Sequence, residues 1–176
     1  PDRSNNVKLG RGGIREIEFL AQVFQLIRGG RDAALRDRST RTTLHTLAEK
    51  QLFKPEVVAQ LLHAYTFLRN LEHRLQYLDD AQTHTLPANE ADRLIIAQMM
   101  GFDDVPALLA ALEVQRALVA TQFDEIFKDK KNDQASDDDV DAELSAVLSD
   151  TDSEQAIEAY LTSLSFDQAS DAAKRL

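Results

Sequence analysis

The sequence contains no cysteine and no tryptophan, and only 6% of its residues are aromatic. Without cysteine the chain cannot form a disulfide, a thiolate metal site or a cysteine nucleophile, which is compatible with a reducing cytoplasm. The low aromatic share argues against a surface on which nucleic-acid bases stack. No signal peptide is visible, and no apolar run approaches the about eighteen residues of a membrane span. We therefore expect a cytoplasmic protein without nucleic-acid or membrane partners.

Candidate metal ligands are scattered along the chain. The four histidines do not form the HExxH pattern that places two zinc ligands on one helical face. The acidic run Asp137–Asp139 lacks the spacing and the glycine of a metal-binding loop, so it is interpreted as solvated linker. His84 lies in a threonine-rich turn before Pro87 and is expected to form hydrogen bonds. The sequence therefore predicts no metal site.

Charge is distributed unevenly. Residues 129–176 carry 13 acidic and four basic side chains, a net charge of −9, whereas residues 1–128 have a net charge of −1. Within the latter, residues 3–41 hold nine lysines and arginines against four acids. This basic region suits a phosphate-bearing small ligand or an acidic partner protein, because nucleic-acid binding needs a wider basic surface. A scaffold that binds a basic partner through the acidic tail is a third, less supported interpretation.

The strongest local pattern is the stretch KLGRGGIREIEFLAQVFQLIRGG, which begins at Lys8. Gly12 and Gly13 permit unusual backbone dihedrals and a close approach to another group just before a helix begins. Helix N-termini favour anions. Lys8 and Arg15 add positive charge there, and Glu16 stands at the rim of the apolar face. These five residues are candidate phosphate or cleft residues. The alternative is a plain loop entering a core helix, since no Walker Gly-Lys-Ser/Thr is present.

Hydrophobic periodicity predicts an antiparallel, all-α helical bundle, since no strand pattern occurs. Ser39 and Asn89 are expected N-caps. Gly29 is expected to end a helix as C-terminal glycines do, and Gly101 to end another. The helices are expected at residues 13–28, 40–52, 55–79, 90–100 and 104–128.

The expected helix over 55–79 carries a leucine-rich seam at alternating spacings of four and three, typical of lengthwise packing against antiparallel neighbours. The leucines in the middle of this seam should be fully buried. Beside the seam runs a stripe that begins apolar and turns polar at Arg69, Glu72 and Gln76. Either this flank meets water, or it is a polar patch that faces another domain, with Arg69 and Glu72 paired at i,i+3.

The expected domain organisation follows from these patterns. Residues 13–128 should form the helical bundle. Residues 129–141 read as an acidic linker with little apolar surface to bury, where limited proteolysis should cut first. Residues 142–176 should form short helices.

Two segments carry a resemblance to a known family. KLGRGGIREIEF, from Lys8, and FLRNLEHRLQYLDDAQTHTLP, over 67–87, resemble the bacterial glutamine synthetase adenylyltransferase/deadenylylase family, and the resemblance extends over residues 5–128. Members hold two nucleotidyltransferase units of the polymerase-β type, each followed by a helical domain, with a helical regulatory region between them. The wording Arg-Glu-Ile-Glu-Phe is similar to that of the first, deadenylylating unit.

The resemblance also implies what lies outside this sequence. The family's catalytic sheet carries a Gly-Ser turn and an Asp-x-Asp metal motif, and this sequence holds no Gly-Ser turn and no Asp-x-Asp on an apolar strand, so residues 1–12 are expected to be the stub after that sheet. Residues 142–176 would begin the regulatory region. In the parent enzyme the implied cofactors are Mg and ATP, and the implied partners are glutamine synthetase, the PII signalling protein and the catalytic sheet itself.

By the same resemblance, the helical domain would close the deadenylylating cleft. Lys8 and Arg15 would stabilise charge, and Glu16 would orient one of them or the substrate. Alone, the chain is expected to bind no cofactor and to be inactive. The alternative function is a non-catalytic helical module that docks a partner protein through its basic N-terminal end.

Overall fold

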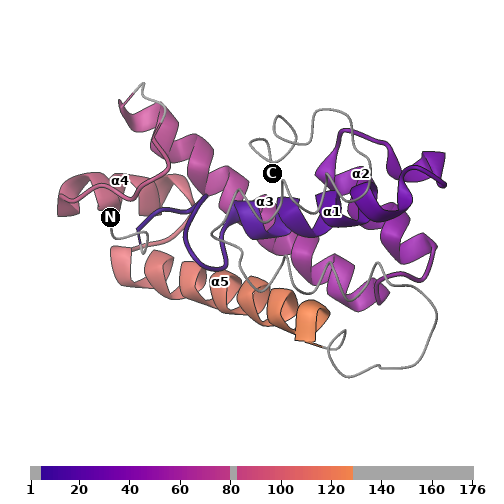
Figure 1. Ribbon diagram of the computed structural model, residues 1–176. Coiled ribbons are helices and arrows are strands. Elements are labelled where there is room, and N and C mark those ends of the chain that lie inside the picture. The colour runs from indigo at the N-terminus through magenta and orange to yellow at the C-terminus, as the bar shows by residue number, and fades with distance from the viewer. Residues whose placement is uncertain (1–4, 80–82, 129–176) are drawn as a thin grey trace. The chain divides into compact units, whose positions relative to one another are not determined.

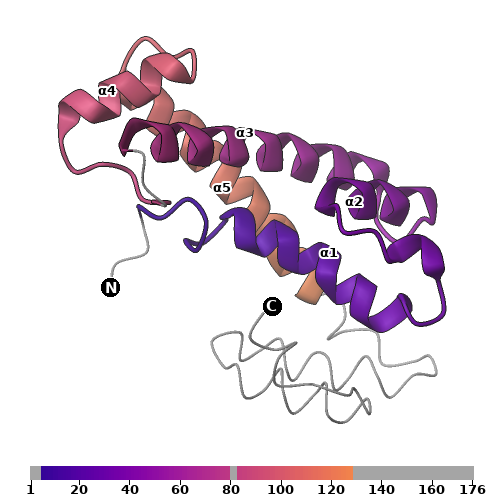
Figure 2. The ribbon, with the colours of Figure 1, turned by 90° about the horizontal axis from the view of Figure 1, so that it is seen from above.

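The computed structural model describes residues 5–79 and 83–128 as a helical bundle (Figures 1 and 2). Its elements are α1 (Ile14–Arg28), the 3₁₀ helix η1 (Ala33–Leu35), α2 (Thr40–Glu49), α3 (Pro55–Asp79), α4 (Glu90–Met99) and α5 (Val105–Lys128). Within these ranges no strand is present beyond one isolated antiparallel bridge. None of the described helices is long and apolar enough to cross a membrane. The predicted all-α class is confirmed.

Contacts within the chain divide it into two compact units, Pro1–Phe123 and Asp124–Leu176. The first unit contains α1 to α4 and most of α5. The linker predicted over 129–141 and the helices predicted over 142–176 lie outside the described residues. The predicted domain boundaries therefore remain predictions.

Helix α3 is the longest element and contacts α1, α2 and α4. Figure 2 shows α2 alongside one end of α3 and α4 near the other end. The seam leucines of α3 form the centre of the core, and Leu68 and Leu71 are both fully buried, as predicted. Burial of apolar side chains on this seam is the main force that holds the helices together.

Most predicted helix ends are confirmed. The Ser39 hydroxyl accepts the N–H of Thr42, and the Asn89 carboxamide oxygen accepts the N–H of Asp92 at 2.8 Å. Gly101 follows α4 with a φ of +82°, a left-handed conformation that suits glycine.

Helix α2 ends at Glu49, three residues before the predicted boundary at 52. The reason is a turn in which Gln51 takes a φ of +58°. The N–H of Leu52 then donates to the carbonyl of Leu47 at 2.9 Å, which closes the helix end. Glycine is the usual residue at this left-handed position, so a glutamine there does not indicate a turn.

Helix α1 ends beside Gly29 as predicted, but the expected left-handed glycine cap is wrong. Gly29 has right-handed dihedrals, φ −62° and ψ −24°. The free carbonyls are instead satisfied by a side chain, because Arg36 Nε donates to the carbonyl of Gly29 at 2.6 Å and its Nη2 donates to that of Gly30 at 2.9 Å. A cationic cap at a helix C-terminus also complements the helix dipole.

Candidate functional site

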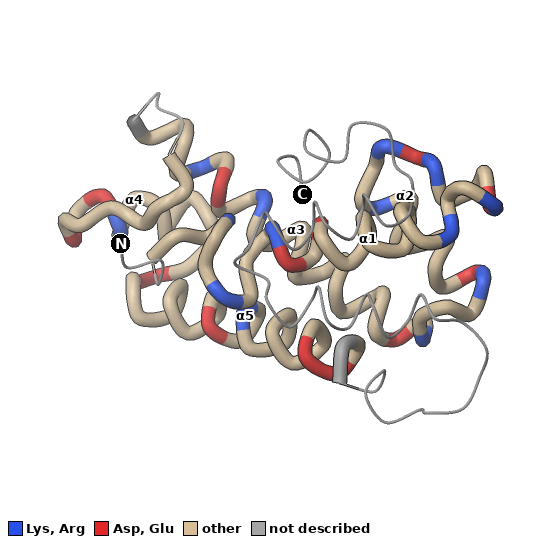
Figure 3. The backbone as a smooth tube through the Cα atoms, viewed as in Figure 1, with Lys and Arg blue, Asp and Glu red and all other residues tan. Residues whose placement is uncertain are grey.

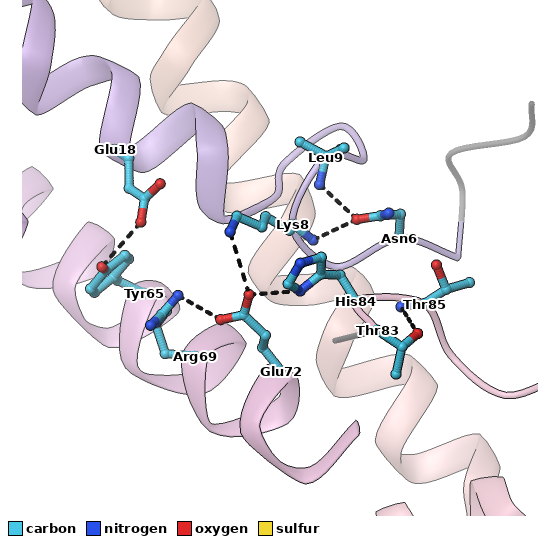
Figure 4. Close-up of polar contacts among 10 residues, drawn as sticks. All are labelled: Asn6, Lys8, Leu9, Glu18, Tyr65, Arg69, Glu72, Thr83, His84 and Thr85. Carbon is cyan, nitrogen blue, oxygen red and sulfur yellow. Dashed lines mark hydrogen bonds and ion pairs between the residues drawn. The ribbon is translucent and has the colours of Figure 1, made fainter. Parts of the chain in front are cut away.

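The loop before α1 is held by the segment that follows α3. Asn6 and Thr85 form an antiparallel bridge. The N–H of Val7 donates to the carbonyl of His84 at 2.8 Å, and the Val7 side chain is fully buried. The Asn6 carboxamide oxygen accepts the N–H of Lys8 at 3.0 Å, which turns the chain towards α1 (Figure 4).

Gly12 and Gly13 both occupy positions where a side chain would collide with backbone. Gly12 has a φ of +68°, and a Cβ there would lie 2.1 Å from the carbonyl oxygen of Arg116 in α5. At Gly13 an added Cβ would lie 2.6 Å from the carbonyl oxygen of Gly10. The predicted unusual dihedral and close approach are confirmed at Gly12, and the group approached is the backbone of α5.

The Arg116 side chain strengthens the same contact. Its Nη2 donates to the carbonyl of Asn6 at 2.6 Å, so α5 is tied to the loop by side chain as well as by backbone. Partial burial lowers the pKa of Arg116, because desolvation disfavours its charge. The glycine loop is therefore packed between α5 and the segment after α3.

The first backbone donors of α1 are already engaged within this loop. The N–H of Gly13 donates to Gly10, that of Ile14 to Val7 and that of Arg15 to Lys8, at 2.9, 3.2 and 3.1 Å. An anion at a helix N-terminus binds to such N–H groups when they are free. The side chains of Lys8 and Arg15, rather than these backbone groups, are what the loop can offer to a phosphate.

The carboxylate of Glu16 contacts Arg11, which was not among the candidate site residues. Glu16 Oε1 lies 3.6 Å from Arg11 Nη1, and the Arg11 guanidinium lies 5.9 Å from the centre of the Phe123 ring. The resemblance implied that Glu16 would orient Lys8, Arg15 or the substrate, and that role remains a prediction. Arg11 thus joins the start of α1 to α5, and its role was not apparent because arginine in a glycine loop has no diagnostic spacing.

Glu72 of α3 is the centre of a cluster formed with Lys8, Arg69 and His84, called here the Glu72 cluster (Figure 4). The Glu72 carboxylate is 2% exposed. Arg69 Nη1 lies 2.6 Å from Oε2, while His84 Nδ1 and Lys8 Nζ lie 2.8 and 3.9 Å from Oε1. The two segments that carry the family resemblance, 8–19 and 67–87, therefore meet at one buried carboxylate.

The contacts in the Glu72 cluster are chiefly electrostatic. Glu72 Oε2 and His84 Nδ1 are buried and have no hydrogen bond of good direction, although both lie at ion-pair distance from a partner. Coulomb attraction depends on distance more than on direction, so the cluster still compensates the buried charge. A carboxylate this deeply buried is tolerated only when it is paired.

On the polar stripe of α3, Glu72 is buried and does not meet water, and the expectation that the stripe faces another domain remains a prediction. The predicted Arg69–Glu72 pair is confirmed. Glu72, however, faces Lys8 and His84 within the same fold, so it neither meets water nor presents a free charge. Gln76, one turn further along, is half-buried. His84 was expected to form hydrogen bonds, but its Nδ1 contacts Glu72 Oε1 at ion-pair distance without hydrogen-bond geometry.

A polar contact joins α1 and α3 two turns from Glu72. The Tyr65 hydroxyl donates to Glu18 Oε1 at 3.4 Å, and the Arg41 guanidinium lies 5.6 Å from the centre of the tyrosine ring. Burial, followed by the nearby Glu18 charge, raises the pKa of Tyr65. With the Glu72 cluster, this contact makes a partly exposed polar strip between the two helices (Figure 4).

The described residues do not by themselves fit a magnesium–nucleotide site. In the described ranges no three His, Cys, Asp or Glu side chains are grouped so that they could hold a metal ion. The space beside Gly12 is filled by the backbone of α5. Magnesium prefers several oxygen ligands and commonly uses one or two carboxylates plus substrate phosphates. No chemical step through magnesium or ATP is therefore assigned to these residues.

Comparison with known proteins gives a consistent result. A family model described as "GlnD PII-uridylyltransferase" matches residues 2–127. A protein of Ralstonia nicotianae is 60% identical over 129 residues, which are 73% of this chain and 14% of that protein. A protein of Burkholderia mallei is 48% identical over 169 residues, covering 94% of this chain and 18% of its own length. A protein of Neisseria meningitidis serogroup A is 49% identical over 126 residues, which are 72% of this chain and 14% of that protein.

These three relatives are all named bifunctional glutamine synthetase adenylyltransferase/adenylyl-removing enzyme. The chain spans less than a fifth of their length. The family model and these identities agree with the resemblance carried by the two segments that meet at Glu72. The chain therefore belongs to the family of bacterial bifunctional glutamine synthetase adenylyltransferase/adenylyl-removing enzymes.

Proposed function

We propose that this chain is the helical domain that completes the deadenylylating nucleotidyltransferase cleft of such an enzyme. The observation that supports the proposal is the convergence of segments 8–19 and 67–87 at Glu72. A cluster that orients Lys8 and Arg69 from two elements is the kind of support that a charge-binding cleft needs. The whole enzyme would add adenylyl groups to glutamine synthetase and remove them.

In this proposal the first unit packs against the catalytic sheet of its own enzyme, which would supply the metal ligands. Mg and ATP would act in the parent enzyme, and PII would be a regulatory partner of that enzyme. Lys8 and Arg15 would stabilise phosphate charge at the edge of the cleft. Glu16, through Arg11, would hold the loop, while Gly12 and Gly13 would allow its close packing. The chain alone would be inactive.

The test uses the full-length enzyme carrying Arg15→Ala or Glu16→Ala. Initial rates of adenylyl removal and adenylyl attachment are measured separately, with folding checked by circular dichroism. Arg15→Ala should reduce removal by about 10²–10³-fold, the scale for one lost electrostatic donor. Attachment should change less. Lys54→Ala is the matched control, because it removes an exposed positive charge just before α3.

The outcomes separate the possibilities. Equal loss in both directions would place the chain beside the other unit or would couple the two units through α1. No loss in either direction, with the fold intact, would reduce residues 12–16 to a loop that enters a core helix.

A second candidate is a non-catalytic docking module for an acidic partner protein. It is favoured by exposed basic residues at the end of α1 and between α1 and α2 that form no ion pair with any described residue: Arg28, Arg31 and Arg38. Figure 3 shows basic residues at this end of the bundle as well as in the loop before α1. Charge reversal at Arg31 and Arg38 should then abolish capture of glutamine synthetase while both rates on saturating substrate persist.

A further inference from the structure

The Glu72 cluster contains more positive charge than its single carboxylate neutralises. Lys8 and Arg69 each carry a full positive charge at neutral pH. Both lie at ion-pair distance from Glu72, so within the described part of this cluster two positive charges face one carboxylate. The nearest other acid on this strip, Glu18, accepts a hydrogen bond from Tyr65.

The three cationic side chains reach the surface while their anchor does not. The Lys8, Arg69 and His84 side chains are 32%, 33% and 26% exposed, whereas the Glu72 carboxylate is 2% exposed. A buried carboxylate that contacts several partly exposed basic side chains fixes their positions, so that their exposed atoms are already placed to bind a ligand. Such preorganisation lowers the ordering cost of binding.

Hydrogen-bond donors remain after the contacts within the cluster. Lys8 Nζ has three donors and lies 3.9 Å from Glu72, which is a loose pair. Arg69 contacts Glu72 through Nη1 alone, so its other guanidinium nitrogens have no further partner in the described part of the chain. His84 Nε2 likewise has no partner among the described residues, and it is a donor when the ring carries both protons.

We propose that Lys8, Arg69 and His84 form a binding subsite for a phosphate-class oxyanion, with Glu72 as the positioning residue behind them. A tetrahedral oxyanion accepts several charge-assisted hydrogen bonds at once, and arginine and lysine are the side chains that phosphate groups commonly bind. The subsite uses side chains and not the backbone donors of the glycine loop, because those donors are engaged within the loop. It deepens the proposed function, but its binding test requires no enzyme activity.

The experiment is a titration of the whole 176-residue chain with inorganic phosphate at low ionic strength. Binding is followed by the NMR shift of the His84 ring C–H, which is assigned by comparison with His84→Gln. Saturable binding is expected at a dissociation constant on the order of millimolar. Lys8→Gln should weaken it about tenfold, the scale of one lost hydrogen bond to a charged group. Lys54→Gln, the matched control, should not.

Two further arms identify the source of the phosphate. If AMP binds about tenfold more tightly than inorganic phosphate and Lys8→Gln weakens both, the oxyanion belongs to a nucleotide; equal affinities indicate free phosphate. The proposal is overturned if chloride at equal ionic strength produces the same shifts, if binding does not saturate, or if Lys54→Gln weakens binding as much as Lys8→Gln. Saturable binding, together with an unchanged rate of adenylyl removal in the Arg15→Ala enzyme, would support the subsite and contradict the cleft role of Arg15.

Discussion

The consequence of neutralising Glu72 can be worked out from its surroundings. Glu72→Gln keeps the size of the side chain but removes the charge that faces Arg69, His84 and Lys8. Breaking a buried ion pair by removing one partner costs about 3–5 kcal/mol when the remaining charge stays buried. Here the remaining cations are about one-third exposed or less and can regain water. We therefore expect a cost of about 1–3 kcal/mol.

The two cationic partners should differ in a way that follows their distances. Arg69→Ala removes the contact at 2.6 Å and leaves the carboxylate buried, so it should cost about 2–4 kcal/mol. Lys8→Gln removes a contact at 3.9 Å between a partly exposed amine and the carboxylate, and it should cost about 1 kcal/mol or less. The order of the three variants in stability loss tests the reasoning as well as the size of each loss does.

The assay is urea unfolding of the whole chain, followed by far-UV circular dichroism, with the slope compared between variants. Glu49→Gln is the matched control, because it neutralises an exposed glutamate at the end of α2. It should change stability by no more than about 0.5 kcal/mol. If Glu72→Gln unfolds at the same urea concentration as Glu49→Gln, the Glu72 cluster does not hold the two family segments together.

Three other perturbations test the core, a helix end and a surface charge. Leu71→Ala, in the fully buried seam of α3, should cost roughly 2–5 kcal/mol, and an unchanged thermal melt would mean that the seam is not the core. Gln51→Gly should stabilise the chain by about 0.5–1 kcal/mol because it relieves a left-handed φ, and a lower urea midpoint would contradict this. The hydrogen bond from Lys50, the largest cause, lowers the pKa of Asp32, so this carboxylate stabilises the fold above its unfolded pKa and loses that contribution as pH falls through the folded value. Asp32→Asn should therefore lower the urea midpoint at neutral pH, and the difference from the native chain should vanish once the pH falls below the lowered folded pKa of Asp32.

Much of the fold could be predicted because its helices carry local signals. The seam of α3 gave its bounds without error, since leucines at spacings of three and four define one helical face. Ser39 and Asn89 marked helix starts through their capping chemistry. The end of α2 was misplaced because Gln51 adopts a left-handed conformation, which glutamine rarely takes and which its sequence context does not predict.

The candidate site was predictable only in part, because its geometry depends on long-range contacts. The i,i+3 pair of Arg69 and Glu72 lies within one helix and could be read from spacing. The contacts of Glu72 with Lys8 and His84 join three separate elements, so no local spacing predicts them. The sequence predicted a close approach at Gly12 but not its partner, because Arg116 of α5 is more than a hundred residues away in the chain.

The burial of Glu72 connects the stability of the fold to its proposed binding role. An oxyanion that binds the folded chain alone stabilises it in proportion to its occupancy of the site. The side chains that would hold the oxyanion are the same ones that compensate Glu72, so each would interact with both the ligand and the buried carboxylate. Lys8, the most loosely paired cation, can turn to a ligand at the smallest cost to the fold. Arg69 lies 2.6 Å from the carboxylate, so replacing it would also destabilise the fold. Substitution of Lys8 is therefore the change that separates the effect on binding from the effect on folding.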